Sequence, residues 1–344
     1  MAVPPRIAIV LAGAVAKGAF EAGALQALSR ADVEIVRIVA ASSGALNGTL
    51  LAANVRTDRV AQGADLLAEL WRDDAGWHDA FHLSASDLIT RRAVSDSQRI
   101  LDLLRARVPP ASTGKDINLR LLVAPLYGTT GMVGQHPATT FEAVRDFAGA
   151  DFASAEALER VFAAATASSA FPFLFAPVDV DDLGPCVDGG AVNNTPVKWA
   201  LEGVMGASID AIVVISTTIE LRPSVPHTLQ GLAYAGHLAT MLIGERLYRD
   251  LKETETANLQ LANLKALLAT GVLDEAQYNQ VLAALDWAGR RPVQIIQIRP
   301  LHDLDGSSFA GFFDVGLRRG YVDAGLARGL EVLETYGWLK ASST

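Results

Sequence analysis

The chain has 344 residues, of which 50% are hydrophobic, so it is long enough for one large α/β domain or two ordinary ones with a sizeable core. The formal net charge of -9 at pH 7 gives no basic surface for nucleic acid and no general attraction to anionic membranes. The single cysteine, Cys186, excludes a disulfide within the chain, and no run approaches the roughly 20 apolar residues of a membrane span. We therefore expect a soluble, cytoplasmic protein.

Short runs rich in Ile, Val and Leu alternate with longer helical patterns, which is typical of buried parallel strands joined by crossover helices. We predict strands at residues 6–11, 36–41, 119–125, 173–180, 210–217 and 293–300. Residues 17–30 fit a helix with Phe20, Ala24, Leu25 and Leu28 on one face. The pattern predicts an α/β fold with a mainly parallel sheet covered by helices.

The first apolar run, "IAIVLAGAVA" (7–16), also fits a secretory signal, because small residues follow an apolar core. Only one arginine, Arg6, precedes the core, and the run breaks at Gly13. These two features favour a strand followed by a loop.

Two stretches carry helical patterns without strand signals. Residues 57–110 fit a helical excursion packed on the sheet or a flap over a site. Residues 229–289 fit three helices, which form either a lateral insertion or a cap at the substrate entrance; Asp274 and Gln277 match a capping box before the last. Because no Gly/Ser-rich linker is present, we predict a single domain over 1–344, with a C-terminal strand and helix at about 293–340.

The predicted strand 36–41 leads into "SSGALNG" (42–48), which resembles a nucleophile elbow, the tight strand-to-helix turn that exposes a serine hydroxyl. Ser42 has Gly44 two residues after it, but Ala40 stands where the G-x-S-x-G pattern has its first glycine. Ser43 would have alanine at both positions, which is a poorer match. Ser42 is thus the candidate nucleophile, although serine also caps helices routinely.

A serine hydroxyl needs a base to accept its proton. None of the six histidines lies in a small-residue turn after a predicted strand. Asp188 ends a short apolar run and is followed by two glycines, which would let other groups approach its carboxylate, although D-G-G is also a common turn. As an alternative, Ser42, Asp188 and His302 follow the chain order of the α/β-hydrolase triad.

The segment "GAVAKG" (13–18) lies between a predicted strand and a predicted helix, where backbone N–H groups can stabilise an anion. A dinucleotide fingerprint would need glycine at Val15, and a phosphate-binding P-loop would need glycine before Lys17 with Ser or Thr after it. Both nucleotide-binding interpretations are therefore disfavoured. An oxyanion hole for acyl transfer fits better.

Together these segments resemble the patatin-like phospholipase family, lipid acyl hydrolases that use a Ser–Asp dyad and no catalytic histidine. The resemblance rests on four ordered blocks: "GAVAKG" (13–18), "AASSGALNG" (40–48), "ATASSAFPFLFAPV" (165–178) and "DGGAVNNTP" (188–196). They correspond to the family's glycine-rich block, its G-x-S-x-G elbow, a block rich in small residues with proline, and its D-G-[GA] block.

The resemblance implies a three-layer α/β/α fold and hydrolysis of fatty acyl esters, as in a phospholipase A or an esterase, through an acyl-enzyme. It implies Ser42 as nucleophile and Asp188 as base, without metal or cofactor. The residues implied around this dyad are the oxyanion-hole amides of Gly13, Ala14 and Val15 and the supporting residues Lys17, Gly18, Gly44 and Gly189. The partner is a lipid or acyl ester, with room for peripheral contact with a membrane or micelle and no role for nucleic acid; the oligomeric state stays open.

Three positions depart from the family's pattern, because Ala14, Val15 and Ala40 stand where glycines are expected. A β-branched residue such as Val15 disfavours the positive φ that glycine permits. Loss of one oxyanion donor costs roughly 2.7 to 4 kcal/mol of transition-state stabilisation. The departures therefore support a second hypothesis, a catalytically weak or silent lipid-binding or interaction module.

Overall fold

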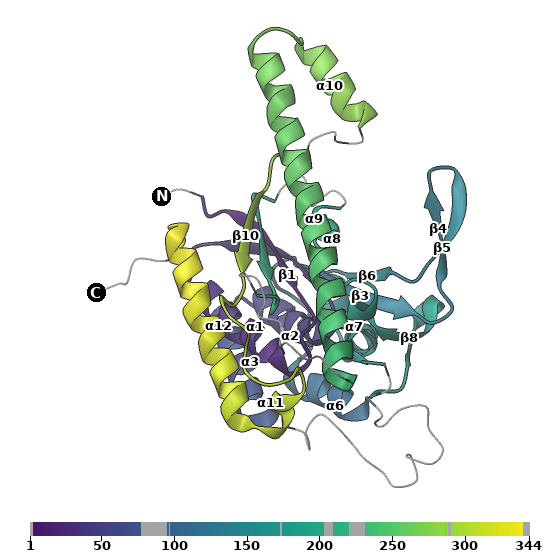
Figure 1. Ribbon diagram of the computed structural model, residues 1–344, viewed down its shortest axis with the longest axis vertical. Coiled ribbons are helices and arrows are strands. Elements are labelled where there is room, and N and C mark those ends of the chain that lie inside the picture. Colours follow the sequence, from purple (N-terminus) through teal and green to yellow (C-terminus); the bar gives the residue numbers. More distant parts are fainter. Residues whose placement is uncertain are drawn as a thin grey trace.

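A mixed β-sheet forms the centre of the molecule, in a computed structural model that describes residues 3–76, 95, 97–172, 174–202, 209–219, 231–285, 287 and 290–339 (Figure 1). The strand order is β10-β9-β1-β2-β3-β8-β7, and β6 also pairs with β3. The strands are β1 (Arg6–Leu11), β2 (Glu34–Ala40), β3 (Asn118–Pro125), β6 (Ala143–Phe147), β7 (Val178–Val180), β8 (Gly184–Asp188), β9 (Ala211–Ile215) and β10 (Gln294–Ile298).

Strands β10, β9, β1, β2 and β3 run parallel, which confirms the predicted α/β fold with a mostly parallel sheet. Strand β1 pairs with neighbours on both edges, and Ile7 to Leu11 are fully buried on both faces of the sheet. Residues 7–11, which also fitted a secretory signal, therefore form the middle of the core. The antiparallel pairings are those of β3 with β6 and β8 and of β8 with β7.

Helices cover both faces of the sheet and give three layers. One face packs against α1 (Gly18–Leu28), α2 (Ser43–Arg56), α3 (Val60–Glu69), α6 (Gln98–Arg107), α7 (Ala155–Ser169) and α12 (Val315–Thr335). The other packs against α8 (Lys198–Leu201) and α9 (Gly231–Ala269) through Ala200 and Leu247. Every residue of α1 is buried, not one face as predicted, because α12 packs against it from the C-terminal part of the chain (Figure 1).

The pairing of β3 brings two distant chain segments together. Strand β2 runs parallel to the first half of β3, from Asn118 to Leu121, and β8 runs antiparallel to its second half, from Val123 to Pro125. Strand β6 occupies the opposite edge of β3 from Leu119 to Val123, a span that overlaps both pairings, so β2 and β8 share one edge. Their carboxyl ends therefore point at each other, and the residues that follow β2 meet the end of β8.

Two of the predicted elements differ in the structure. Of the strand expected at 173–180, where residue 173 lies outside the described residues, the described part forms only β7 (Val178–Val180), since Pro172 and Pro177 cannot donate to a ladder. The first two helices expected within 229–289 are one continuous helix, α9, because the polar stretch between them contains no Gly or Pro. Inside α9, the Thr254 and Thr256 hydroxyls donate to carbonyls one turn earlier, so these side chains do not interrupt it.

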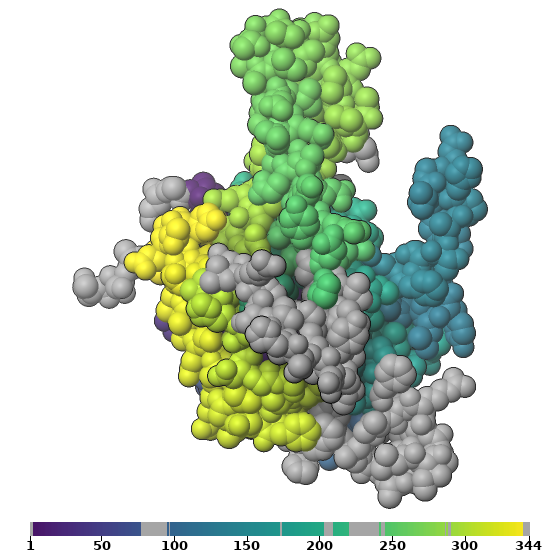
Figure 2. All heavy atoms as spheres, viewed as in Figure 1, coloured from purple at the N-terminus to yellow at the C-terminus, as the bar shows by residue number. Residues whose placement is uncertain are grey.

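The capping box before α10 (Glu275–Ala284) is confirmed, because Asp274 and Gln277 exchange side-chain-to-backbone hydrogen bonds. The far half of α9 and α10 project from the body, as does a hairpin of β4 (Thr129–Val133) and β5 (His136–Thr140) (Figures 1 and 2). The hairpin was not predicted, because its residues do not alternate between apolar and polar.

The 57–110 stretch is helical where the structure describes it. Helix α3 runs directly into a π-helical turn, η2 (Leu70–Asp74), and α6 follows later, whereas residues 77–94 and 96, within the proposed flap, lie outside the described residues. The remaining short helices are η1 (Val15–Lys17), η3 (Gly149–Phe152), η4 (Asp181–Leu183), η5 (Gly189–Ala191) and α11 (Ala310–Phe313). Among the described residues, no helix combines the length and apolar character needed to cross a bilayer.

Candidate active site

Ser42 lies in the sharp turn between β2 and α2, with φ 55° and ψ -133°. This backbone conformation is strained for any residue with a side chain and is found mainly at functional sites. The turn is as tight as a nucleophile elbow requires, because a Cβ on Gly44 would collide with the carbonyl of Leu11. Ala40 is fully buried in β2 and fits there without changing the strand. The Ser42 N–H donates to Ser168 Oγ at 3.0 Å, which holds the turn against α7.

Asp188 meets Ser42 because the ends of β2 and β8 face each other. The Ser42 hydroxyl donates to Asp188 Oδ2 at 2.7 Å, and the N–H of Gly190 donates to Asp188 Oδ1 at 2.7 Å. The Asp188 N–H in turn donates to the carbonyl of Ala170 at 3.0 Å. Both oxygens of the carboxylate are therefore oriented, one of them toward the serine.

Burial sets the electrostatics of this pair. Asp188 is 2% exposed and Ser42 is 6% exposed. Removal from water raises the pKa of Asp188 to about 7, although the hydrogen bonds from Ser42 and Gly190 favour the ionised form. A carboxylate with this pKa is a much stronger base than one in water, whose pKa is about 3.9.

No histidine among the described side chains donates to or accepts from Ser42 or Asp188. His302, the third member of the alternative triad, is exposed to solvent. His78, His82 and His227 lie outside the described residues, and so does the side chain of His237. The geometry around Ser42 is that of a direct serine–aspartate pair.

The three expected oxyanion donors are not equivalent. The N–H of Gly13 donates to the carbonyl of Asn194 at 3.3 Å, and the N–H of Ala14 donates to Ser43 Oγ at 3.0 Å. The N–H of Val15 has no hydrogen-bond partner among the described residues. Val15 also has φ 53°, the positive value that its β-branched side chain disfavours.

Gly13 lies directly against the serine. A Cβ at this position would overlap the side chains of Ser42 and Asn194, so only glycine fits. The Asn194 side chain also donates from Nδ2 to the carbonyl of Gly13 at 2.7 Å. The sequence block around Asn194 was part of the resemblance, but its pattern carried no signal for this contact because the two residues are far apart in the chain.

A C-terminal loop braces the segment that carries Val15. Lys17 donates from Nζ to the carbonyl of Leu304 at 2.8 Å, and the N–H of Ala16 donates to the carbonyl of Ser308 at 3.1 Å. Burial lowers the pKa of Lys17, although Asp303 and Asp305 lie near enough to favour its charged form. Backbone carbonyls leave no signature in a sequence, so this contact could not be predicted.

The other expected supporting residues occupy crowded positions. A Cβ on Gly18 would touch Ser43 Oγ and the ring of Trp71, and one on Gly189 would overlap the carbonyl of Leu122. Their contribution is close packing of backbone around Ser42 and Asp188.

A largely apolar pocket of about 130 Å³ opens beside Ser42. Phe171 and Phe309 form an edge-to-face pair with ring centroids 5.7 Å apart in its wall. The lining comes from η1, the elbow, α2, α3, η2, α6, the segment after α7 and α11, and includes Val15, Leu46, Leu50, Leu67, Leu70, Trp71, Ile100, Leu103, Leu174, Phe175 and Phe312. Such a cavity accommodates an apolar chain attached to a carbonyl at Ser42.

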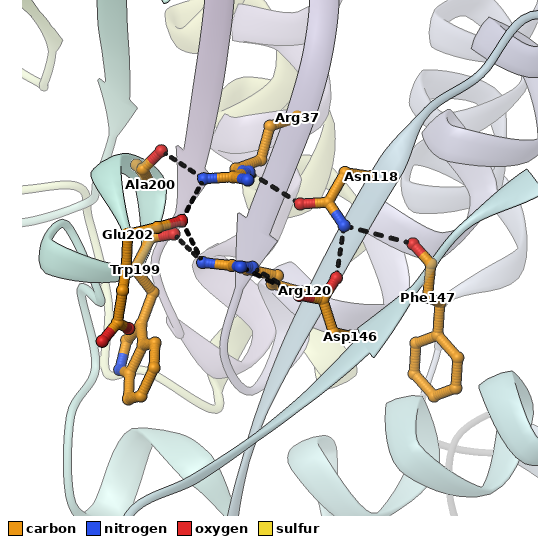
Figure 3. Close-up of polar contacts among 8 residues, drawn as sticks. All are labelled: Arg37, Asn118, Arg120, Asp146, Phe147, Trp199, Ala200 and Glu202. Atoms are coloured by element: carbon orange, nitrogen blue, oxygen red, sulfur yellow. Dashed lines mark hydrogen bonds and ion pairs between the residues drawn. The ribbon is translucent and has the colours of Figure 1, made fainter. Parts of the chain in front are cut away.

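A buried arginine pair holds the segment that follows Asp188 (Figure 3). Arg37 donates to the carbonyls of Ala200 and Glu202, each at 2.8 Å, and Arg120 donates to those of Trp199 and Glu202 at 2.8 and 2.9 Å. Burial and the neighbouring Arg120 lower the pKa of Arg37 to about 10. These bonds fix the end of α8 to β2 and β3, and with it the loop that carries Asn194.

Comparison with known proteins gives one family match. The family model described as patatin-like phospholipase matches residues 9–201, which include Ser42, Asp188 and the loop at Val15. The crystal structure of VipD from Legionella pneumophila is similar with a TM-score of 0.40 and 13% identity, over 97% of this chain and 67% of that one. No curated protein sequence matches the chain.

Proposed function

The chain belongs to the patatin-like phospholipase family, and from this premise we propose that it is a serine lipid acyl hydrolase that cleaves fatty acyl esters with Ser42 as nucleophile and Asp188 as base. The family points to lipid substrates in general. The observation that carries the proposal is the 2.7 Å hydrogen bond from the strained Ser42 to the buried Asp188, beside an apolar pocket.

In the first step, Ser42 Oγ attacks the ester carbonyl while its proton moves to Asp188 Oδ2. The carbonyl oxygen becomes an oxyanion. Of the three predicted donors in the glycine-rich loop, the N–H of Val15 is the one that no described acceptor engages, so it binds the oxyanion. The tetrahedral intermediate then collapses, and Asp188 returns the proton to the leaving alcohol.

In the second step, water attacks the acyl-enzyme. Asp188 accepts a proton from the water, and the fatty acid leaves as Ser42 Oγ regains its hydrogen. Asp188 thus alternates between base and acid, which suits a carboxyl with a pKa of about 7. The chain's own residues supply every proton transfer in this scheme.

Two substitutions test the dyad. Ser42→Ala and Asp188→Asn should each lower kcat for a p-nitrophenyl acyl ester by at least about 1,000-fold, as removal of a member of the serine triad does. Ser29→Ala and Asp102→Asn, which lie outside the site, are the matched controls and should keep full activity. Full hydrolysis by either dyad variant would refute the proposal.

A catalytically silent lipid-binding module is the second candidate, because protein acceptors already engage the N–H groups of Gly13 and Ala14. A fluorophosphonate probe separates the two, since it reacts only with an activated serine. We expect labelling of the native chain at Ser42 and none of Ser42→Ala. Absence of labelling in the native chain would favour the silent module.

The Ser-His-Asp alternative makes a separate prediction. If His302 were the base, His302→Ala would abolish hydrolysis while the chain stayed folded. We expect His302→Ala to retain activity, because the Ser42 hydroxyl already donates directly to a carboxylate.

A further inference from the structure

Glu142 is a largely buried carboxylate that the proposed reaction does not use. It lies between β5 and β6, and its side chain is 13% exposed. Its Oε1 accepts from Trp199 Nε1 at 2.6 Å and from Asn193 Nδ2 at 3.2 Å, and Lys198 Nζ lies 3.2 Å from the same oxygen. Its Oε2 accepts from Arg246 at 3.1 Å. One carboxylate therefore joins the start of β6 to α8, to the segment before α8 and to α9.

These contacts lie on both sides of Asn194. The residue before it, Asn193, and two residues at the start of α8 all bind the same oxygen of Glu142. Asn194 in turn donates from Nδ2 to the carbonyl of Gly13 at 2.7 Å, and its own carbonyl accepts from the N–H of Gly13 at 3.3 Å. Because Gly13 lies directly against Ser42, the position of this segment sets where the glycine-rich loop lies relative to the nucleophile.

Helix α9 contributes the cation that contacts two acids in this cluster. Arg246 donates to Glu142, and its Nε lies 3.2 Å from Asp250 Oδ1. Asp250 is 8% exposed. Burial raises the pKa of Asp250, the charge of Arg246 opposes this, and the charge of Glu142 adds to it. Removal of Arg246 would thus leave two poorly hydrated carboxylates without the cation between them, which is costly.

Glu142 acts as a charged acceptor. Burial by itself would raise the pKa of its carboxyl, but the hydrogen bond from Trp199 and the charge of Lys198 hold that pKa below its usual value. Hydrogen bonds to an ionised acceptor are shorter and stronger than those between neutral groups. The ionised Glu142 therefore holds Asn193 and the start of α8 more firmly than a neutral side chain would.

The part of α9 that carries Arg246 lies behind the site. It packs through Leu247 on one face of the sheet, whereas the pocket residues Leu50 and Leu67 belong to the core of the other face. No described side chain of α9 lines the pocket. The described contacts of α9 therefore reach the site through Glu142, not as a cap over the pocket.

We propose that Glu142 and Arg246 are positioning residues, through which helix α9 holds the glycine-rich loop in place beside the nucleophile. This inference rests on the proposed hydrolase function and deepens it, because it gives the helical insertion a part in that site. Neither residue touches the substrate. Both act through Asn193 and the contact between Asn194 and Gly13.

The first test measures kcat and KM for a p-nitrophenyl acyl ester. Glu142→Ala should lower kcat by roughly 10- to 100-fold with little change in KM, since small displacements of catalytic groups have effects of this size and the pocket is untouched. Glu142→Gln keeps an acceptor for Asn193 and Trp199 and should restore most of kcat. Glu159→Ala, which removes an exposed carboxylate paired with Arg105, is the matched control. Native kcat in Glu142→Ala would overturn the proposal.

The second test addresses α9. Arg246→Ala should also lower kcat without a matching change in KM, and Arg246→Lys, which keeps the charge, should recover part of the loss. Arg249→Ala is the control on the same helix, because Arg249 is exposed and pairs with Glu245 within α9. Native kcat in Arg246→Ala would show that α9 has no part in the site.

A double-mutant cycle tests the route. If Glu142 acts through Asn193, the loss of kcat in the double variant Glu142→Ala, Asn193→Ala should be smaller than the product of the two single losses. Losses that multiply would contradict this route.

Hydrogen exchange separates this inference from the hydrolase function, because it needs no substrate. The peptide that contains Gly13 and Val15 should exchange faster in Glu142→Ala than in the native chain, and at the native rate in Glu159→Ala. If the native chain hydrolyses no ester while this exchange rises, the proposed function fails and the positioning role stands. If the native chain is active and Glu142→Ala keeps native exchange and kcat, the positioning role fails and the function stands.

Discussion

Ser42 and Asp188 each lower the stability of the folded chain. Ser42 has a strained backbone, which costs on the order of 1–3 kcal/mol, and Asp188 is a carboxylate with almost no access to water. The fold tolerates both residues because contacts of β2, β8 and α7 hold the backbone of Ser42 and Asp188 in place. Strained and desolvated residues that lie together beside a pocket are typical of catalytic sites.

In the proposed mechanism, the protonation of Asp188 sets the pH dependence of hydrolysis. Its carboxyl must be ionised to accept the Ser42 proton, and its pKa in the folded protein is about 7. We expect kcat/KM to reach a plateau above this pH and to fall about tenfold per pH unit well below it. The rate of fluorophosphonate labelling should follow the same curve. A profile that stays flat down to pH 5 would contradict Asp188 as the base.

Val15 is the second strained residue, with a φ of 53°. Val15→Gly should raise the free energy of unfolding by about 1 kcal/mol, because relief of roughly 1–3 kcal/mol of strain exceeds the 0.5–1 kcal/mol that glycine adds to the entropy of the unfolded chain. Hydrolysis should be retained, since the N–H keeps its place. Denaturant unfolding measures the change, and Val133→Gly, at an exposed hairpin position, serves as the control.

At the scale of elements, the site depends on loops that clamp one another. The loop after Asp188 holds Gly13 through Asn194, and the arginine pair holds the end of α8 that follows this loop. The C-terminal loop holds Lys17 from the other side. The glycine-rich segment is therefore positioned by two parts of the chain that are distant in sequence.

Asn194→Ala tests this clamp. The variant leaves the carbonyl of Gly13 without its side-chain donor, which should lower the free energy of unfolding by roughly 1–3 kcal/mol and lower kcat more than it changes KM. Asn54→Ala is the matched control, since Asn54 donates only to the carbonyl of Leu50 within α2. Native kcat in Asn194→Ala would show that the clamp has no part in positioning the loop.

At the scale of the whole molecule, the site extends beyond the region that the family model matches. Residues 9–201 carry Ser42, Asp188 and Val15, whereas Leu304, Phe309 and Phe312 come from the C-terminal part. Helix α12 also covers the outer side of α1. Both the site and helix α1 therefore depend on the C-terminal part of the chain. This dependence supports the prediction of one domain over the whole chain, which stays a prediction.

A chain that ends at residue 300 should fail to fold. It would lack α11 and α12 and expose α1, whose residues are all buried in the native structure. Circular dichroism and solubility measure the outcome, and a chain that ends at residue 339 is the control. A cooperative thermal transition in the shorter chain would show that the C-terminal part is dispensable for folding.

The sequence by itself determined the features that depend on local pattern. Apolar runs predicted β1, β2, β3, β9 and β10, and small residues around Ser42 and Asp188 marked the two turns that lie together. The extent of β7 and the continuity of α9 were predicted wrongly, since prolines and threonines act through contacts that periodicity does not report.

Only the tertiary structure decided which groups are available for chemistry. Asn194 and Ser43 engage the N–H groups of Gly13 and Ala14, whereas no acceptor in the described part of the chain engages that of Val15, and this follows from packing between distant segments. The raised pKa of Asp188 has the same origin, because burial is a property of the assembled layers. Local pattern encodes elements and turns, whereas hydrogen-bond partners and desolvation depend on which segments meet.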